Sequence, residues 1–549
     1  MHTTYTGFVA RPEWRWVSWV SLLLICIAFV PFLIVASGNQ QQENWRFMGA
    51  LHQYHNAASS LSRIQQGYTG DWLVRLRYTP DDHQGALVQP IYTLLGHLAR
   101  LSSLSVPTIF HAARLFAALW MYAALYQLGA SVWTKIRTRR IFFLIAALGS
   151  GFGWLSGFLT GSAQSPDLLY ASAYPFFSTL VSVHEPLTIG ALAIMASVLI
   201  SALRPGHQNS PGMQNGGLVI ILMGLSIIFL MPQALVPILA ALGLTVVAVC
   251  WQQKRYDVNA IRWFTWLLIP VLPVAAYYWA ILRNNLIIRD WVQQNSQPVP
   301  DPLWLIIGLG VPLLIALPGL YRALRRFEQD GDQFMLLWFA LMLMALYLPI
   351  GLGGQAMTGL MIPIAYFATR AAEDTWLPRI NRRRRTWLYG ILLPLMALSH
   401  VMVLLVPIAS IFNQKTDYYG TLLEPDYVAA FGWLRQNVRP EDVILAAPDD
   451  VSAWIPFWTG GHTVYGHADE TYHATQRYFQ VLSWYGASDA ADPICSDLVN
   501  NEDFVVFFVL LGPRERALGP AACTGGLLQA ATFGSVTIYA NPVAFRFVQ

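Results

Sequence analysis

The fold is decided by the polar stretch at 37–104, whose sequence is SGNQQQENWRFMGALHQYHNAASSLSRIQQGYTGDWLVRLRYTPDDHQGALVQPIYTLLGHLARLSSL. It follows an uncharged apolar segment at 17–36 and is the longest polar segment before the C-terminal region. About 20 apolar residues suffice to cross the hydrocarbon core, so 17–36 is expected to be a membrane helix. The polar stretch is therefore expected to belong to a large loop, 37–106, that the rest of the chain holds at one face of a membrane.

The composition is that of a polytopic membrane protein. The chain has 549 residues, of which 55% are hydrophobic and 12% are charged, whereas soluble domains carry about 25% charged residues. The sequence contains no phosphate-binding glycine loop, no serine-hydrolase elbow and no basic segment interleaved with aromatic residues. Nucleotide chemistry, serine hydrolysis and a nucleic-acid partner therefore lack support.

About eleven apolar segments are expected to cross the membrane and to form an α-helical domain over residues 1–411. They lie at about 17–36, 107–128, 141–159, 186–203, 216–230, 234–251, 261–282, 303–322, 333–350, 356–370 and 387–411. With a cytoplasmic N-terminus, alternate connections carry the basic residues, among them Lys135, Arg204, Lys254 and Arg322. Since basic loops stay on the cytoplasmic side, a multi-pass protein of the cell membrane is predicted, with the 37–106 loop and everything after 411 outside.

Three apolar segments need a separate interpretation. The segment at 86–104 would invert every later basic connection if it crossed, and it carries polar residues such as His97 and Arg100. It is therefore expected to lie flat as an interfacial amphipathic helix. The segments at 216–230 and 356–370 are short and adjoin turns with Gly or Pro. They either line an outward-facing cavity or are accommodated by tilt and local thinning, and both interpretations stay open.

Residues 412–549 have the composition of a soluble α/β domain, which is expected to be extracytoplasmic. Helices are expected from Pro425 to about Leu434 and over 472–485, and buried strands over 443–447, 504–511 and 536–539. Strands that alternate with helices are typical of a small α/β fold. Cys495 and Cys523 are a candidate disulfide pair, because disulfides form in oxidising compartments.

Acidic residues of the outer segments are the first candidates for catalysis. Asp71, Asp81 and Asp82 can deprotonate an acceptor hydroxyl or hold a divalent cation, and they are densest at Asp81-Asp82-His83. A solvated turn after Thr79-Pro80 also explains that cluster, and it is the simpler interpretation. Asp167, in the connection at 160–185, is the fourth candidate.

Candidate binding residues are Arg77, Arg114, His184 and Glu185. Arg77 can meet a lipid phosphate, or it can anchor the loop at the headgroups. Arg114 lies inside the span 107–128, where its partner is either a phosphate-bearing ligand or a carboxylate of a neighbouring helix. His184 and Glu185 stand at the mouth of the next span, where they either contribute to a site or cap the helix start.

Two polar segments of the C-terminal region also contain ionisable residues. The segment 461–473 holds three histidines and two acids, but their spacing fits no standard zinc site. A polar loop over the membrane face is the better interpretation. The segment 512–516, with sequence GPRER, follows an expected buried strand. The carboxyl ends of strands are where α/β sheets tend to bind ligands.

The layout resembles the GT-C superfamily of membrane glycosyltransferases, and more narrowly a family of bacterial GT-C-like membrane proteins. The resemblance is carried by QGYTGDWL at 66–73, LGHLAR at 95–100, GSGFGW at 149–154, PDL at 166–168, and the segments 464–471 and 512–516. It implies a polyprenyl-phosphate sugar as donor and transfer with inversion. It also implies an acidic residue of the first outer loop as base or metal ligand.

One position departs from the family pattern. That pattern places an Asp about ten residues before the Q-G-x-x-G segment, and Asn56 stands there in this chain. An amide cannot act as a general base and is a poor substitute for a carboxylate at a metal. The turn near 351–355 is similarly reduced to Gly353-Gly354-Gln355. The resemblance therefore implies either that the acid has moved to Asp71, Asp81 or Asp167, or that activity is lost.

The first hypothesis is a membrane glycosyltransferase that takes a sugar from a polyprenyl-phosphate donor at the outer face. Its catalytic candidates are Asp81, Asp82, Asp71 and Asp167; its donor-phosphate and substrate candidates are Arg114, Arg77, His184 and Glu185. The alternative is a catalytically inactive GT-C-like scaffold or lipid-binding membrane protein. A transporter would require inverted repeats and mid-membrane charges. The expected partners are a lipid-linked sugar donor and membrane lipid, and a divalent cation is left open as cofactor.

Overall fold

The computed structural model describes residues 7–38, 44–204, 215–295, 297–349, 351–412 and 420–546. The chain forms two compact units. The first, here called the helical unit, comprises Met1–Phe29, Ala112–Tyr278 and Ser296–Val406. The second, the mixed unit, comprises Val30–His111, Trp279–Asn295 and Pro407–Gln549. Most of the polar loop thus belongs to the same compact unit as the C-terminal region. The boundary predicted at 411 stays a prediction.

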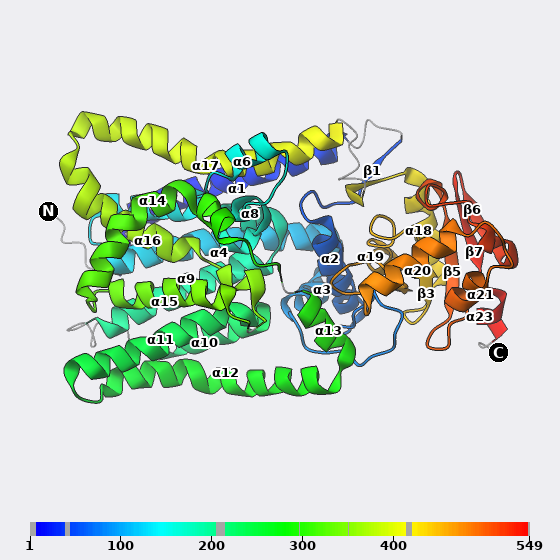
Figure 1. Cartoon of the computed structure of the whole chain (residues 1–549), viewed down its shortest axis with the longest axis horizontal. Coiled ribbons are helices and arrows are strands. Elements are labelled where there is room, and N and C mark those ends of the chain that lie inside the picture. Colours follow the sequence, from blue (N-terminus) through cyan, green and yellow to red (C-terminus); the bar gives the residue numbers. More distant parts are fainter. Residues whose placement is uncertain are drawn as a thin grey trace. The chain divides into compact units, whose positions relative to one another are not determined.

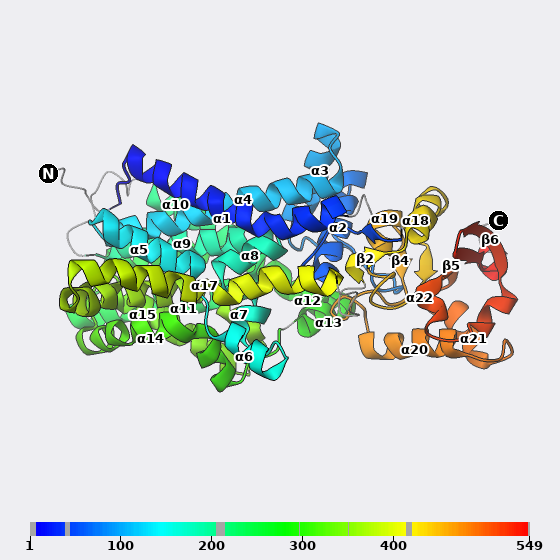
Figure 2. The same cartoon turned by 90° about the horizontal axis from the view of Figure 1, so that it is seen from above.

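Apolar helices, most of them long, make up most of the helical unit and run side by side in Figures 1 and 2. They are α1 (Arg11–Gly38), α4 (Val106–Val132), α5 (Ile136–Leu148), α6 (Gly153–Thr160), α9 (His184–Leu203), α10 (Gly216–Leu230), α11 (Pro232–Gln253), α12 (Val258–Asn284), α14 (Pro302–Arg326), α15 (Asp332–Tyr347), α16 (Met361–Ala371) and α17 (Arg382–Phe412). Shorter elements are α7 (Pro166–Leu169), η1 (Ala171–Ala173), α8 (Pro175–Val181), η3 (Gly353–Met357), η4 (Ala372–Trp376) and η5 (Leu377–Arg379).

The predicted class, an α-helical polytopic membrane protein, is confirmed. Within the described residues, eight helical segments are long and apolar enough to cross a membrane. The helices α10 and α15 are apolar but shorter. Each of the eleven predicted positions contains helix, and the total number of spans stays a prediction.

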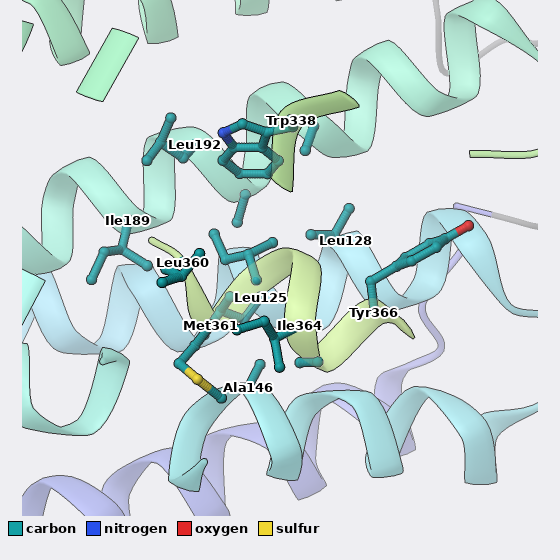
Figure 3. Packing of buried hydrophobic residues seen from close by; sticks show 14 of the residues in the cluster. Leu125, Leu128, Ala146, Ile189, Leu192, Trp338, Leu360, Met361, Ile364 and Tyr366 are labelled. Carbon is teal, nitrogen blue, oxygen red and sulfur yellow. The ribbon is translucent and has the colours of Figure 1, made fainter. Parts of the chain in front are cut away.

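The short helix α16 is explained by its surroundings. Every residue from Met361 to Thr369 is buried, and Figure 3 shows Met361 and Ile364 among side chains of other helices, including Leu125, Ala146 and Trp338. A helix enclosed by protein does not need to match the thickness of the hydrocarbon core. This segment at 356–370 is therefore short because protein surrounds it.

In the mixed unit, α2 (Tyr54–Thr69) and α3 (Ile91–Ser102) are in backbone contact through two glycines. A Cβ atom on Gly67 would lie 2.1 Å from the carbonyl oxygen of Thr93, and one on Gly96 would lie 2.1 Å from that of Ile64. With 12 residues, α3 is too short to span a bilayer. It exposes leucines such as Leu101 on one face, as expected for an interfacial helix.

The C-terminal region contains the predicted small α/β fold. Its sheet has the order β4-β3-β5-β7-β6, in which β4, β3 and β5 are parallel while β7 is antiparallel to both β5 and β6. The strands are β3 (Val443–Leu445), β4 (His462–Thr463), β5 (Val506–Leu511), β6 (Leu528–Phe533) and β7 (Val536–Ala540). The helices are α18 (Pro425–Asn437), α19 (Ile455–Thr459), α20 (Ala474–Gly486), α21 (Pro493–Val499), α22 (Pro513–Arg516), η7 (Ala522–Gly526) and α23 (Pro542–Arg546). The strands β4 and β6 were not predicted.

Two further elements complete the mixed unit. The strands β1 (Arg46–Phe47) and β2 (Leu422–Leu423) pair antiparallel, so the polar loop and the C-terminal region share a second, small sheet. The helix α13 (Leu286–Gln294) begins with Asn285, whose side chain accepts a hydrogen bond from the N–H of Ile288.

The predicted disulfide between Cys495 and Cys523 is present, with its Cα atoms 5.0 Å apart. It closes a loop with a sequence separation of 28. Replacing both cysteines by Ala is expected to lower the free energy of unfolding by about 2–4 kcal/mol, because the crosslink restricts the unfolded chain. Thermal unfolding should show this loss, and wild-type protein treated with a reductant should match the variant. An unchanged melting temperature in both would contradict it.

Candidate functional site

The mixed unit contains a hollow of about 730 Å³ beside the end of strand β3. It is lined by Gln294, Asp449, Tyr465, Ala468, His473, Ala474, Thr475, Gln476 and Tyr478. We call it the Asp449 hollow, because Asp449 is the acidic residue that lines it. The buried strand β3 ends at Leu445, and Pro448 stops its continuation. Asp449 follows in the left-handed region with φ 66°, which Asp tolerates better than most residues.

The carboxylate of Asp449 is placed to act as a base. Its side chain is 40% exposed, and it accepts a hydrogen bond of 3.1 Å from the hydroxyl of Tyr465. Partial burial raises the pKa of Asp449 above its ordinary value, although the hydrogen bond from Tyr465 and the nearby His467 oppose the shift. His55 lies 3.8 Å from the carboxylate, and burial lowers the pKa of this imidazole to about 4. The imidazole of His55 is therefore neutral at neutral pH.

The N-terminus of α20 faces the same hollow. Its first three residues, Ala474, Thr475 and Gln476, all line it, and the preceding residue His473 makes no side-chain cap. No described group accepts a hydrogen bond from the backbone N–H groups of these three residues. Free N–H groups and the positive end of the helix dipole together favour an anion such as phosphate. The hollow is thus lined both by a carboxylate and by a helix end that favours an anion.

Asn56, the position that departs from the family pattern, contacts His467, the residue that precedes Ala468 of the hollow. The backbone N–H of Asp469 donates to Nδ1 of His467 at 3.1 Å, so the neutral ring carries its proton on Nε2. Nε2 therefore donates to Oδ1 of Asn56, 3.2 Å away. Glu470 accepts from Arg63 at 2.7 Å and from the hydroxyl of Ser59. Asn56 is thus an exposed acceptor for a buried histidine, and its amide supplies no base.

The segment 512–516 lies at the carboxyl end of β5, as predicted. There Arg514 pairs with Asp450 at 3.0 Å and with Glu424 at 3.1 Å. Buried Glu515 accepts from the backbone N–H of Ala447 at 2.8 Å. Since these charges are matched within the protein, this end of the sheet is held together by internal ion pairs.

The predicted acids of the polar loop are not among the residues that line the Asp449 hollow. Asp81 pairs with Arg477 at 3.2 Å, and the hydroxyl of Thr79 donates to it. Asp82 is exposed, and Asp71 is 57% exposed and 3.9 Å from Arg77. None of these three acids lines the hollow. Their catalytic role stays a prediction without a shared pocket to support it.

Arg77 is buried and donates to the carbonyl oxygen of Gly460. Burial lowers the pKa of this guanidinium to about 10, against the opposing charge of Asp71, so it stays protonated at neutral pH. Its contacts join the polar loop to the C-terminal region. A role in holding a donor phosphate stays a prediction.

The other predicted site residues belong to the helical unit. Buried Asp167 accepts from the N–H groups of Gly151 at 2.9 Å and Gly153 at 3.1 Å, and from the hydroxyl of Ser165. Burial raises the pKa of Asp167 and these hydrogen bonds oppose the rise. Such an acceptor organises the turn at 149–153, which lies within the motif GSGFGW at 149–154.

Arg114, His184 and Glu185 contact the ends of helices in the same unit. Arg114 donates to the carbonyl oxygens of Thr179 at 2.9 Å and Leu180 at 2.6 Å, at the C-terminal end of α8. A cation is favourable there because of the helix dipole. His184 and buried Glu185 form the first turn of α9. The placement of His184 and Glu185 fits the helix-capping interpretation, whereas the acceptors of Arg114 are backbone carbonyl oxygens and not the predicted carboxylate of a neighbouring helix. A binding role for the three residues stays a prediction.

Asp449 and the start of α20 were missed as functional features, although two signals were present. Asp449-Asp450 follows the predicted strand 443–447, in the same relation that drew attention to 512–516. The predicted helix over 472–485 begins beside the histidine-rich segment. What the sequence does not show is that both line one hollow.

The described residues include no group of three or more His, Cys, Asp or Glu side chains arranged to hold a metal ion. The carboxylate of Asp449 has an imidazole and a phenol as its closest polar neighbours. These groups do not fit a divalent-cation site, so no step proposed below runs through a metal.

No model of a known family and no curated protein matches this sequence, but solved structures match its fold. The oligosaccharyltransferase AglB from Archaeoglobus fulgidus, in complex with an inhibitory peptide and a dolichol-phosphate, gives a TM-score of 0.55 at 11% identity, over 97% of this chain and 75% of that chain. The same archaeal enzyme tethered with an acceptor peptide containing the NVT sequon gives 0.52 at 12% identity, over 96% and 74%.

ArnT from Cupriavidus metallidurans in the apo state gives a TM-score of 0.53 at 14% identity, over 96% of this chain and 98% of that chain. These structures are GT-C superfamily membrane glycosyltransferases. At such identities the likeness concerns the fold, and it extends over nearly the whole chain. The chain therefore has the same multi-pass membrane fold as these solved structures.

Proposed function

We propose that this protein is a membrane glycosyltransferase that takes a sugar from a polyprenyl-phosphate donor. The observation that carries the proposal is the Asp449 hollow, which is lined by both a carboxylate and the uncapped N-terminus of α20. Sugar transfer from a lipid phosphate needs a base for the acceptor and a site for the departing phosphate. The GT-C fold and the dolichol-phosphate bound in one structural neighbour support the donor class.

In the proposed reaction, the acceptor hydroxyl gives its proton to Asp449. The acceptor oxygen forms a bond to the anomeric carbon while the bond from that carbon to the phosphate oxygen breaks. The phosphate leaves with the electron pair, and its charge is stabilised by the N–H groups of Ala474, Thr475 and Gln476. A direct displacement of this kind inverts the anomeric centre.

The site is proposed to lie at the outer face of the cell membrane, with the N-terminus in the cytoplasm. The alternation of basic connections along the helical unit supports this orientation. The disulfide between Cys495 and Cys523 supports it independently, since such bonds persist outside the cytoplasm.

The test is donor turnover by the purified full chain in liposomes. A panel of polyprenyl-phosphate-linked pentoses and hexoses is supplied with an extract of membrane lipids as the source of acceptor, and free polyprenyl phosphate is measured by chromatography. We expect release from at least one donor above the level of protein-free liposomes. If none of the donors in the panel releases polyprenyl phosphate, the proposed glycosyltransferase activity is refuted.

A catalytically inactive GT-C-like scaffold or lipid-binding protein is the second candidate. It is favoured by Asn56, whose amide replaces the acid of the family pattern, and by the pairing of Asp81 with Arg477. The donor assay separates the two candidates. A scaffold would retain lipid-linked sugar without releasing polyprenyl phosphate, whereas an enzyme would release it.

A further inference from the structure

The helical unit contains an apolar groove with two arginines at one end. The groove has a volume of about 760 Å³ and lies among α5, α14, η4, η5 and α17. Its apolar walls include Leu144, Ile315 and Leu392, and Arg137 and Arg140 lie in the first turns of α5. From Arg137 to Ile145 the helix rises by about 12 Å, which is most of the depth of one leaflet of the hydrocarbon core.

The two guanidinium groups have no acidic partner. Arg137 donates to the hydroxyl of Tyr389 at 2.8 Å, and Arg140 stands 4.6 Å from the ring centre of Trp16. Neither forms an ion pair with any described residue, and no acidic residue lines the groove. Arg139, which lies between them in the sequence, is instead buried and paired with Glu13 at 3.0 Å. The charges at the groove are thus left for a ligand.

Two acidic residues of η4 form ion pairs with residues that do not line the groove. Glu373 pairs with Lys135 at 2.7 Å, and Asp374 pairs with Arg322 at 2.6 Å. Both acids lie in η4, the π-helical turn that follows α16 and supplies Trp376 to the groove. Such turns are often found at functional sites, because they displace side chains from the regular helical face. This turn brings an aromatic side chain to the groove while its acids pair with other cations.

We propose that this groove binds an anionic phospholipid, with the phosphate at Arg137 and Arg140 and an acyl chain along the apolar walls. A lipid fits both features, since it offers a negative headgroup joined to a hydrocarbon chain. Guanidinium groups bind phosphate oxygens well. The site is distinct from the Asp449 hollow, because all of its lining residues belong to the helical unit. It would take a structural or regulatory lipid.

The test is native mass spectrometry of the purified full chain after incubation with dioleoylphosphatidylglycerol or dioleoylphosphatidylcholine. We expect wild type to retain the anionic lipid preferentially. Replacing Arg137 and Arg140 together by Gln should reduce its retention by about thirtyfold, because each cation near an anionic headgroup contributes to binding. The matched control replaces Arg325 and Arg326 by Gln, two exposed arginines outside the groove. This control should leave retention unchanged.

A second variant tests the acyl-chain site separately. Leu144→Trp fills the groove without changing charge, and it should reduce retention of phosphatidylglycerol, with gel filtration confirming a folded protein. Inorganic phosphate should fail to displace the lipid. Equal retention of the two lipids by wild type, or equal losses in the groove and control arginine variants, would overturn the proposal. Displacement of the lipid by inorganic phosphate would also overturn the proposal. The proposal would likewise fail if the protein were a dimer that Leu144→Trp dissociates.

Discussion

Asp449→Asn is expected to lower the rate of sugar transfer by about 10²–10⁴-fold, the usual contribution of a positioned general base. The amide keeps the size of the side chain and the hydrogen bond from Tyr465, but it cannot take up the acceptor proton. Since the side chain is 40% exposed, the fold should survive. The measurement is release of polyprenyl phosphate by wild type and variant at equal protein concentration, with melting temperatures compared in parallel.

The matched control is Asp82→Asn, which changes the same functional group at an exposed position outside the hollow. It should leave both the rate and the melting temperature close to those of wild type. If Asp449→Asn retains full activity while Asp82→Asn loses it, the base lies in the polar loop, as the sequence alone had suggested.

We expect the carboxylate of Asp449 to set the pH dependence of the transfer rate as well. A base acts only when ionised, so activity falls as the pH drops through the pKa of Asp449, which partial burial has raised. The acidic limb of the rate profile should therefore lie above the ordinary range of an aspartate. Tyr465→Phe removes a hydrogen bond that lowers this pKa. The limb should move to still higher pH in that variant, and a shift to lower pH would contradict the assignment.

The fold was largely predictable because its signals are local. Apolar length marked the positions of the spans, and Pro425 marked the start of α18. Because basic connections alternate along the chain, the segment that forms α3 was predicted not to cross the membrane. The strand β4 was missed because it has only two residues, and β6 because its side chains are mostly exposed. Short and solvent-facing strands carry little hydrophobic signal.

The site was less predictable because its parts are far apart in sequence. Ser59 and Glu470, which form a hydrogen bond, are separated by 411 residues. No local pattern fixes which residues of α2 meet the segment 443–473, since that register follows from packing. The density of acids along the sequence therefore favoured Asp81-Asp82, whereas the structure places a carboxylate and a free helix end together at Asp449.

Glu470→Ala is expected to lower the free energy of unfolding of the mixed unit by about 3–5 kcal/mol. Glu470 and Arg63 are paired at 2.7 Å with side chains only 7% and 6% exposed. Removing the acid leaves a buried cation without its partner, which costs more than the pair itself contributes. Chemical unfolding followed by tryptophan fluorescence should show the loss. Arg435→Gln, an exposed control on α18, should stay within about 0.5 kcal/mol of wild type.

The double variant Arg63→Met, Glu470→Leu separates charge burial from packing. Apolar side chains of similar size leave no unpaired charge, so this variant should recover most of the stability that Glu470→Ala loses. Arg63 also lies 5.1 Å from the ring centre of Trp291, so the pair connects three segments of the mixed unit. If the polar loop and the C-terminal region unfold as one body, Glu470→Ala should shift a single transition. Two separate transitions would instead show that residues 412–549 fold by themselves, as the sequence alone predicts.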